Sequence, residues 1–597
     1  MSASAWSRGF GNFEGSYSTA LRSSLTSNYS FKPRSLIDEE RDRADGGGKS
    51  LRRTLNGFQL ICLGVGNIVG AGIFVTTGRV AHNQAGPAVI VSYAIAAVSA
   101  LLSALCYAEF ATEIPIAGGA MSYTSITAGP LLGWLVGTNL IIPHIVGNSG
   151  VLRNFSAYFA QLIDVQGKTD LQVHTAGGLS LDFFAFGLAL ALTVLLILGT
   201  HETSLFNLVV TVIHVLGILF VIVAGMTQAN PAYAHPFAPF GARGIFDGAT
   251  TAFFAFIGAD ALANTAEEVI NPKKDLPVGL LGSLGVVTTL YVLMAATLIL
   301  LIPYTQIDPK AAFAAAFQMT GLPWAKYIVA AAALMGILTG PLIGFYAGAR
   351  IIYVLGRERL LPPVFAQMSA KFGTPVVATA VQGVVVSLIT LFTPFEYLSD
   401  ATSISTLFSF FLVAASLLWR RYYGQGGAEK GANPWLPAAH LVWLILSAVG
   451  LSVWYQERLH WAGLVCFGIS ALASVVSLQV FVKQTHKPGE GSFAAWVPWV
   501  PAASVVLNVF LLGAVSRTAW GRFGWWIAAT LVVFFFYSLP SSYLHSRSRL
   551  PNNGHDDGLA TGRLGQEGQK QDGENNPPLL HPLLQPEQDT TGSNTQS

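Results

Sequence analysis

Long apolar runs, each able to cross a lipid bilayer, take up most of this 597-residue sequence. A helix of about 20 apolar residues spans the roughly 30 Å of hydrocarbon in a membrane. About fourteen such runs lie at 58–79, 87–110, 130–159, 182–199, 204–226, 245–265, 277–302, 324–355, 376–393, 398–419, 436–454, 460–482, 496–515 and 524–544. Only 11% of the residues are charged, whereas soluble domains carry about 25%. The sequence therefore predicts an all-α polytopic membrane protein.

The apolar runs also predict the domain organisation. Residues 1–50 and 546–597 are polar, and we expect them to form disordered tails because they cannot bury a hydrophobic core. The first ten helices would form a core over 51–420, and the last four would follow over 421–545. An even number of spans places both termini on one side. Lys and Arg are more frequent on the flanks of that side, which predicts cytoplasmic termini.

Several function classes lack their usual sequence signals. The formal net charge is only +2, and no basic block with interleaved aromatic residues suggests a nucleic-acid partner. Cys62, Cys106 and Cys466 lie inside apolar runs, where we interpret them as packing residues. No Gly-Lys-Ser/Thr phosphate loop and no Cys/His ligand cluster occurs. We therefore expect no enzyme activity, no cofactor, no metal and no use of ATP. The expected partner of the apolar helices is the lipid bilayer.

The first apolar run contains a glycine-rich segment, Asn67-Ile-Val-Gly-Ala-Gly-Ile-Phe74, preceded by Gly66. Each glycine destabilises a helix by roughly 1 kcal/mol relative to alanine, so the segment predicts a break in the first membrane helix. A broken membrane helix exposes N–H groups on one half and carbonyl groups on the other, and together these can hold a zwitterion. The alternative is close helix packing through small residues, as in many membrane helices.

A second break is predicted in the sixth run, within Phe253–Glu268. Gly258 and Asp260 stand where a membrane helix should be most apolar. The first and sixth helices hold the same place in two five-helix halves, which is typical of inverted-repeat transporters. A carboxylate in mid-membrane usually faces a cavity or a partner. Asp260 is thus either the counter-ion of a cationic substrate or an acid that caps the restarting helix.

Two further titratable residues lie within or at the end of apolar runs. His214 stands in the fifth run, and its ordinary pKa near 6.5 would let it carry a coupling proton. Neutral packing of the imidazole is the alternative. Glu109 closes the second run, where it would pair with a base on the cytoplasmic side or take part in a gate.

Several motifs resemble one known family. They are Gly70-Ala-Gly-Ile-Phe-Val75, His82-Asn-Gln-Ala-Gly-Pro-Ala88, Cys106-Tyr-Ala-Glu-Phe-Ala-Thr-Glu-Ile-Pro-Ile-Ala-Gly-Gly119, Asn271-Pro-Lys-Lys-Asp-Leu-Pro277, Gly373-Thr-Pro-Val-Val-Ala-Thr379 and Trp496-Val-Pro-Trp-Val-Pro501. In this combination the chain resembles the cationic amino acid transporters of the amino acid–polyamine–organocation superfamily, particularly their plant branch. The likeness covers roughly residues 50–546. It implies the leucine-transporter fold with a 5+5 inverted repeat, four extra C-terminal helices and transport by alternating access.

The resemblance also implies a substrate site made by the two broken helices. Backbone N–H groups of the first helix would bind the substrate carboxylate, and backbone carbonyls of both helices would bind its amino group. Phe254 would act as an aromatic gate, and Asp260 would line the site. The carboxylate-binding residues would be Gly70, Ala71 and Gly72, and the carbonyls would be those of Ile68, Phe254 and Ile257. Arginine, lysine, ornithine and histidine would be the substrates.

The sequence departs from the family pattern at a few positions. His214 stands where relatives carry lysine or asparagine, which keeps proton coupling open, and Ala259 replaces a bulkier residue, which would widen the site. At Gly348-Ala-Arg350 the family's proline is missing. We expect a plasma-membrane carrier of cationic amino acids, coupled to protons or driven by the membrane potential. A vacuolar location, a broad or neutral amino acid permease and a non-transporting nutrient receptor are the alternatives; the oligomeric state stays open.

Overall fold

The structure is a computed structural model. It describes residues 23–24, 55–114, 119–163, 172–174, 180–198, 201–309, 311–369, 374–393, 395–423, 435–457, 460–485 and 496–548. The predicted tails lie outside the described residues, apart from Ser23, Ser24 and residues 546–548. The predicted boundary at residue 420 falls inside a helix that continues to Tyr422.

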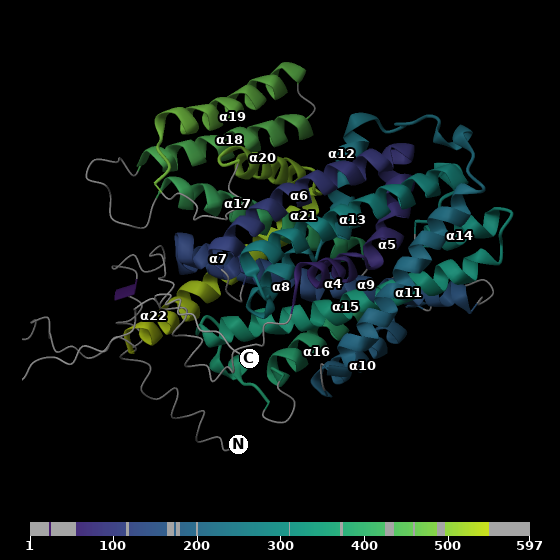
Figure 1. Ribbon diagram of the computed structural model, residues 1–597, viewed down its shortest axis with the longest axis horizontal. Coiled ribbons are helices and arrows are strands. Elements are labelled where there is room, and N and C mark those ends of the chain that lie inside the picture. Colours follow the sequence, from purple (N-terminus) through teal and green to yellow (C-terminus); the bar gives the residue numbers. More distant parts are fainter. Residues whose placement is uncertain are drawn as a thin grey trace, which may run out of the picture. The chain divides into compact units, whose positions relative to one another are not determined.

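The described part of the chain is almost entirely helical (Figure 1). The helices of the core and its loops are α4 Gly57–Ile68, α5 Ala71–Val80, α6 Val89–Glu113, α7 Gly119–Ala128, α8 Pro130–Ile142, α9 Asn148–Leu162, α10 Phe183–Leu198, α11 His201–Met226, α12 Gly241–Ala252, α13 Pro272–Leu301, α14 Ala312–Met319, α15 Ala325–Arg357, α16 Val376–Phe392 and α17 Phe395–Tyr422. The C-terminal helices are α18 Trp435–Gln456, α19 Trp461–Phe481, α20 Trp499–Gly513, α21 Arg517–Val533 and α22 Leu539–Ser548. Two short strands, β1 Val173–His174 and β2 Ser180–Leu181, pair antiparallel.

The helices confirm the all-α polytopic class. Each of the fourteen predicted ranges contains helix. Among the described residues, nine helical runs are long and apolar enough to cross a membrane, judged by length and composition, and four apolar helices are shorter. The sixth predicted span, 245–265, belongs to neither group because its α-helix stops at Ala252. Each five-helix half thus begins with an interrupted helix, as the sequence predicts.

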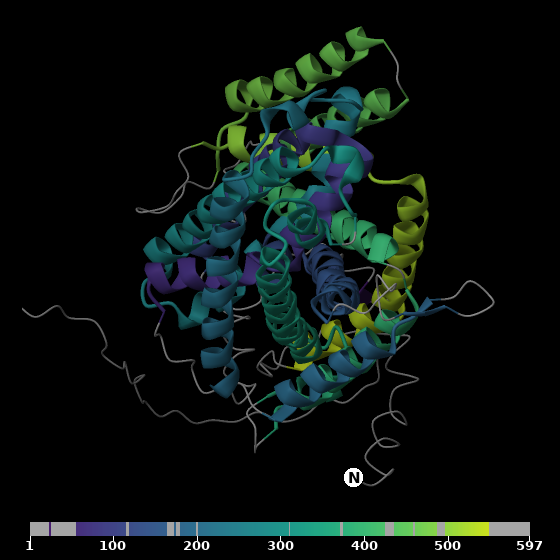
Figure 2. The same ribbon diagram turned by 90° about the vertical axis from the view of Figure 1, so that its right-hand side faces the viewer.

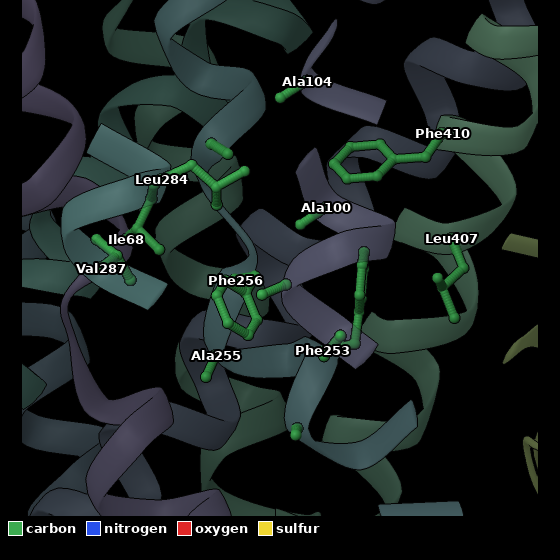
Figure 3. Packing of buried hydrophobic residues seen from close by; sticks show 14 of the residues in the cluster. Ile68, Ala100, Ala104, Phe253, Ala255, Phe256, Leu284, Val287, Leu407 and Phe410 are labelled. Atoms are coloured by element: carbon green, nitrogen blue, oxygen red, sulfur yellow. The ribbon is translucent and has the colours of Figure 1, made fainter. Parts of the chain in front are cut away.

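The core is centred on α13, which packs along α4 and α6. Tyr93 of α6 and Tyr291 of α13 meet edge to face with ring centroids 5.9 Å apart, and the ring centroid of Phe256 lies 5.3 Å from that of Tyr291. Figure 3 shows Ile68 beside Leu284 and Val287 of α13, with Phe256 close by. Both interrupted helices are therefore held against one continuous helix.

The C-terminal helices pack on one flank of this core. In both views α18 and α19 lie side by side at its edge (Figures 1 and 2). α20 contacts α6, α17 and α18. It is joined to α6 by buried polar side chains, because Asn508 donates to Ser103 at 3.0 Å and Ser99 donates to Asn508 at 3.0 Å. Such hydrogen bonds are favourable in an apolar surrounding, where water does not compete for the polar groups.

Candidate functional site

The first interruption is two residues long. α4 ends at Ile68, Val69 turns to an extended conformation, and α5 restarts at Ala71 after Gly70. The first N–H groups of an α-helix have no acceptor within the helix, and the helix dipole makes this end positive. The interruption therefore places the positive end of a helix inside the bundle, next to buried Val69 and Gly70.

Gly72 brings α5 into contact with the second interrupted helix. A Cβ atom at Gly72 would lie 2.5 Å from the Cα atom of Ala255, which leaves no room for any side chain. At Gly70 a Cβ would meet only an ordinary contact, 3.6 Å from the carbonyl oxygen of Gly336. The two interpretations of the glycine-rich segment are therefore both right: the helix breaks at Gly70, and Gly72 serves close packing.

The second interruption is longer and less regular. After α12, residues Phe253–Phe256 form a 3₁₀ turn (η6), Ile257 is extended, and Gly258 adopts a left-handed conformation with φ 108°. A second 3₁₀ segment (η7) then runs over Ala259–Glu268. Glycine is the residue best suited to the positive φ at position 258. The sequence predicts this break but not the long 3₁₀ segment after it.

Two side chains tie the interruptions together, and sequence reasoning missed both. Asn67 Nδ2 donates to the carbonyl oxygen of Gly258 at 2.6 Å. The hydroxyl of Tyr291 lies 2.8 Å from the carbonyl oxygen of Ile68 and 3.1 Å from that of Ala255. A phenol in the middle of an apolar helix usually needs a hydrogen-bond partner, and this was the signal available for Tyr291.

The predicted carbonyl groups have different surroundings. The Ile68 carbonyl already accepts from Tyr291, and the Phe254 carbonyl accepts from the N–H of Ile257 at 3.4 Å. A carbonyl oxygen has two lone pairs, so each can accept a second hydrogen bond. The Phe254 side chain is buried. Phe253 and Phe410 are buried too, and their rings meet edge to face with centroids 5.8 Å apart. Phe254, which the sequence predicts as a gate, lies in η6, within the second interruption.

Asp260 lies in the first turn of η7 and is only 8% exposed. The N-cap of this segment is Gly258, which has no side-chain cap, so Asp260 is not the N-cap residue. Its carboxylate is close enough to Tyr107 of α6 for an electrostatic interaction. The Tyr107 hydroxyl is buried and has no hydrogen-bond partner among the described residues. The buried acid thus lies near a polar side chain of α6, Tyr107.

His214 lies behind the first interruption. Its buried imidazole packs edge to face against the Phe74 ring of α5, with centroids 5.5 Å apart. The ring fills the space over Gly336 of α15, where a Cβ would overlap it, and it interacts with the backbone of Ala332. His214 thus contacts both α5, which follows the first break, and α15, which lies beside it.

Glu109 belongs to a separate group of charges between the ends of α6 and α17. It forms a buried ion pair with Arg421, and Arg421 also lies 2.7 Å from Glu113. Arg420 donates to Glu113 at 2.8 Å. Sequence reasoning identified Glu109 but missed its partners, because Arg420 and Arg421 follow it by more than 300 residues. This cluster fastens one end of α17 to α6.

Comparisons with known proteins show the family of the chain. A family model described as amino acid permease matches residues 55–462, and one described as the C-terminus of AA_permease matches residues 494–542. The chain is 39% identical over 518 residues to "Cationic amino acid transporter 1" of Arabidopsis thaliana, covering 86% of this chain and 87% of the relative.

Two other relatives have names that differ in location or substrate. "Cationic amino acid transporter 8, vacuolar" of Arabidopsis thaliana is 38% identical over 499 residues, 82% of each chain. "Methylthioribose transporter" of Bacillus subtilis is 33% identical over 426 residues, covering 70% of this chain and 90% of the relative. These matches are to transporters, not to enzymes. The chain therefore belongs to the amino acid permease family and, within it, to the branch of the cationic amino acid transporters.

Proposed function

We propose that the protein carries cationic amino acids, namely arginine, lysine, ornithine and histidine, across a membrane by alternating access. The observation that carries the proposal is the meeting of two interrupted helices, with a helix start on one side and the buried carboxylate of Asp260 on the other. The plant relative named a cationic amino acid transporter, 39% identical, supports the substrate class.

In this proposal the backbone recognises what all amino acids share. The N–H groups around Gly70, Ala71 and Gly72 bind the α-carboxylate at the positive end of α5. The carbonyl groups of Ile68, Phe254 and Ile257 accept from the α-amino group. These groups distinguish amino acids from other solutes, but they do not distinguish one side chain from another.

Asp260 supplies the discrimination between side chains. A buried carboxylate binds a cationic head group through a charge-assisted hydrogen bond, which is about twice as strong as a neutral one. Tyr107 lies close by and can orient the carboxylate. Phe254 closes the site as its aromatic gate, and the buried ring cluster around Phe253 excludes water.

The driving force has two sources in this proposal. A monovalent cationic substrate gains about 2.3 kcal/mol per 100 mV on moving toward the negative side of the membrane. Proton coupling would add to this through His214, whose contact with Phe74 links it to α5. Glu109, with Arg421, fastens α17 to α6 and would act as the gate at that end. We place the carrier in the plasma membrane with cytoplasmic termini; the relative named vacuolar supports the alternative location.

A broad permease is the second candidate. One relative, 33% identical to this chain, is named a methylthioribose transporter. Its name gives a substrate that is not an amino acid, which favours a broader range of substrates in this family. Ala259, the small residue before Asp260, supports a wider site. In a permease of this kind Asp260 would not select cations, and neutral amino acids would compete equally with arginine.

Radiolabelled arginine uptake into proteoliposomes tests the proposal. The purified protein is reconstituted, an inside-negative potential is imposed at equal pH on both sides, and unlabelled leucine is added as competitor. Potential-driven arginine accumulation that resists leucine is the expected result. Equal inhibition by leucine would favour the broad permease. A folded sample without uptake would overturn the transport proposal and favour the receptor.

A further inference from the structure

A cavity of about 820 Å³ lies between the core and the C-terminal helices, away from the contact between Gly72 and Ala255. Its core side is formed by the end of α5, by α12 along its length and by the N-terminal part of α17. Its other side is formed by the end of α18, the end of α20 and the start of α21. The size falls within the roughly 300–1,000 Å³ of small-molecule sites. We call it the lateral cavity.

Six charged side chains line the lateral cavity, three of each sign. Four of them form two ion pairs, because Arg243 lies 3.7 Å from Asp247, and Arg517 lies 2.5 Å from Glu457. The remaining two are Arg79 of α5 and Asp400 of α17. Neither has an ion pair among the described residues, and Asp400 accepts only from the hydroxyl of Ser516, at 3.2 Å.

The polar lining has further hydrogen-bonding capacity that the described residues do not use. The Arg79 Nη1 atom, the Gln84 Oε1 atom and the Gln456 Nε2 atom are buried and have no hydrogen-bond partner within the described part of the chain. Gln456 is oriented by Arg243, which donates to its Oε1 atom at 3.3 Å. Buried polar groups are almost always hydrogen-bonded in native proteins. The cavity therefore offers both donors and acceptors, together with one unpaired charge of each sign.

Aromatic side chains also line the lateral cavity. Phe408 and Phe411 of α17 and Trp520 of α21 line it. Aromatic faces bind alkyl chains and, through the cation–π interaction, guanidinium and ammonium groups. A ligand that fits this mixed lining carries a carboxylate and an ammonium group together with an alkyl or cationic chain.

We propose that the lateral cavity is a second binding site for a free α-amino acid. Arg79 binds the carboxylate, Asp400 binds the α-ammonium group, and the side chain lies against Phe408, Phe411 and Trp520. The choice of arginine as the probe rests on the proposed function. The proposal that the lateral cavity binds a zwitterion rests on the residues that line the cavity. Under the predicted orientation this face is the outer one, so the cavity meets the amino acid before the interrupted helices do.

Equilibrium binding of radiolabelled L-arginine and, separately, L-leucine to the purified full chain tests the proposal. The variants are Arg79→Gln and Asp400→Asn. The matched controls, Lys326→Gln and Asp308→Asn, remove one charge of the same sign without lining the cavity. Each protein is measured in detergent and in nanodiscs with and without phosphatidylethanolamine, whose head group also carries an ammonium and an anion.

Two arginine molecules per wild-type chain are expected, with the second site weakened at least tenfold in both variants and unchanged in both controls. One arginine per chain, or a second site indifferent to both variants, would overturn the proposal. A second site lost only with phosphatidylethanolamine would assign the cavity to a lipid head group and also overturn it. Parallel uptake assays separate the two proposals: one bound arginine with intact uptake contradicts only the second site, whereas two without uptake contradict only the transport function.

Discussion

The two interrupted helices hold the same place in their five-helix halves, yet they are interrupted in different ways. The first has an α-helix on both sides and only Val69 and Gly70 between them. The second passes from an α-helix through two 3₁₀ segments and has no α-helix over Ala259–Glu268. A regular helix start presents its N–H groups at fixed positions. An irregular backbone presents side chains and carbonyl groups at positions that can differ from one sequence to another.

This difference divides the recognition of an amino acid into two tasks. In our proposal the first interruption binds the invariant carboxylate through backbone atoms, so its side chains need only be small. The second interruption contacts the substrate side chain, which differs between amino acids, through Phe254 and Asp260. Asn67 and Tyr291 keep the two in register by hydrogen bonds that cross between them. Four substitutions test this division.

The largest effect is expected at the contact between the interruptions. In Gly72→Ala the new Cβ would lie 2.5 Å from the Ala255 backbone, which must move away. Overpacking by a methyl group typically destabilises a site by 1–3 kcal/mol, so we expect the maximal uptake rate to fall by roughly 100-fold. Uptake per folded chain is measured in proteoliposomes. Gly187→Ala in α10 is the control, because its Cβ would meet nothing within 4 Å. Equal activities would show that the contact is dispensable.

The substitution Asp260→Asn separates the two tasks directly. It removes the charge and preserves the size of the side chain. Loss of a hydrogen bond to a charged group is worth about 1.5–3 kcal/mol, so arginine uptake should fall roughly 10- to 100-fold while leucine uptake is unchanged or rises. Asp275→Asn in the first turn of α13 is the control. A parallel loss of both substrates would assign Asp260 to the fold, not to selectivity.

A smaller effect is expected for Tyr291→Phe, which removes the hydroxyl shared by Ile68 and Ala255. One neutral hydrogen bond contributes about 0.5–1.5 kcal/mol, and the ring still fits its place beside Phe256. We expect KM for arginine and for leucine to rise together, roughly 2- to 10-fold, since both tasks depend on the register. An effect on only one substrate would contradict the shared role. Thr76→Val is the control. It removes another buried hydroxyl, which is hydrogen-bonded to Tyr93 of the same aromatic cluster, and shows whether the loss of any hydroxyl there raises KM.

The smallest effect at neutral pH is expected for His214→Asn. If the imidazole carries the coupling proton, wild-type uptake rises as the pH falls through the ordinary histidine pKa near 6.5. The variant should lose this dependence and keep substrate exchange. The exposed His460 offers a control, because asparagine can also cap α19 at that position. An unchanged pH profile in His214→Asn would remove the coupling role and leave a histidine packed between α5 and α15.

Local signals in the sequence were sufficient for the helices and for both breaks. Glycines and a carboxylate in an apolar run conflict with a continuous membrane helix, and this conflict is visible within a few residues of Gly70 and Gly258. The partners across the breaks were not visible. Asn67 and Gly258 are 191 residues apart, and Tyr291 is 223 residues from Ile68. Such contacts depend on how the helices pack, and no local pattern encodes them.

The lateral cavity was also invisible in the sequence, for a similar reason. Arg79, Asp400 and Gln456 each resemble an ordinary charged or polar residue near the end of a helix, where snorkelling is the usual explanation. Only the docking of the C-terminal helices on the core encloses them. The predicted substrate site contains residues that are unusual in a membrane helix, so the sequence reveals it. The lateral cavity contains residues that are common at helix ends, so only the packing of the helices reveals it.

The polar row between α6 and α20 has a consequence for biosynthesis. Ser103 and Asn508 are 405 residues apart, and a ribosome adds roughly 5–20 residues per second. On the order of 20–80 s therefore pass between the synthesis of the two partners. During this interval the serines of α6 lie in the membrane, or in the insertion machinery, before their partner helix exists. Assembly of the transporter is complete only when nearly the last helix has been made.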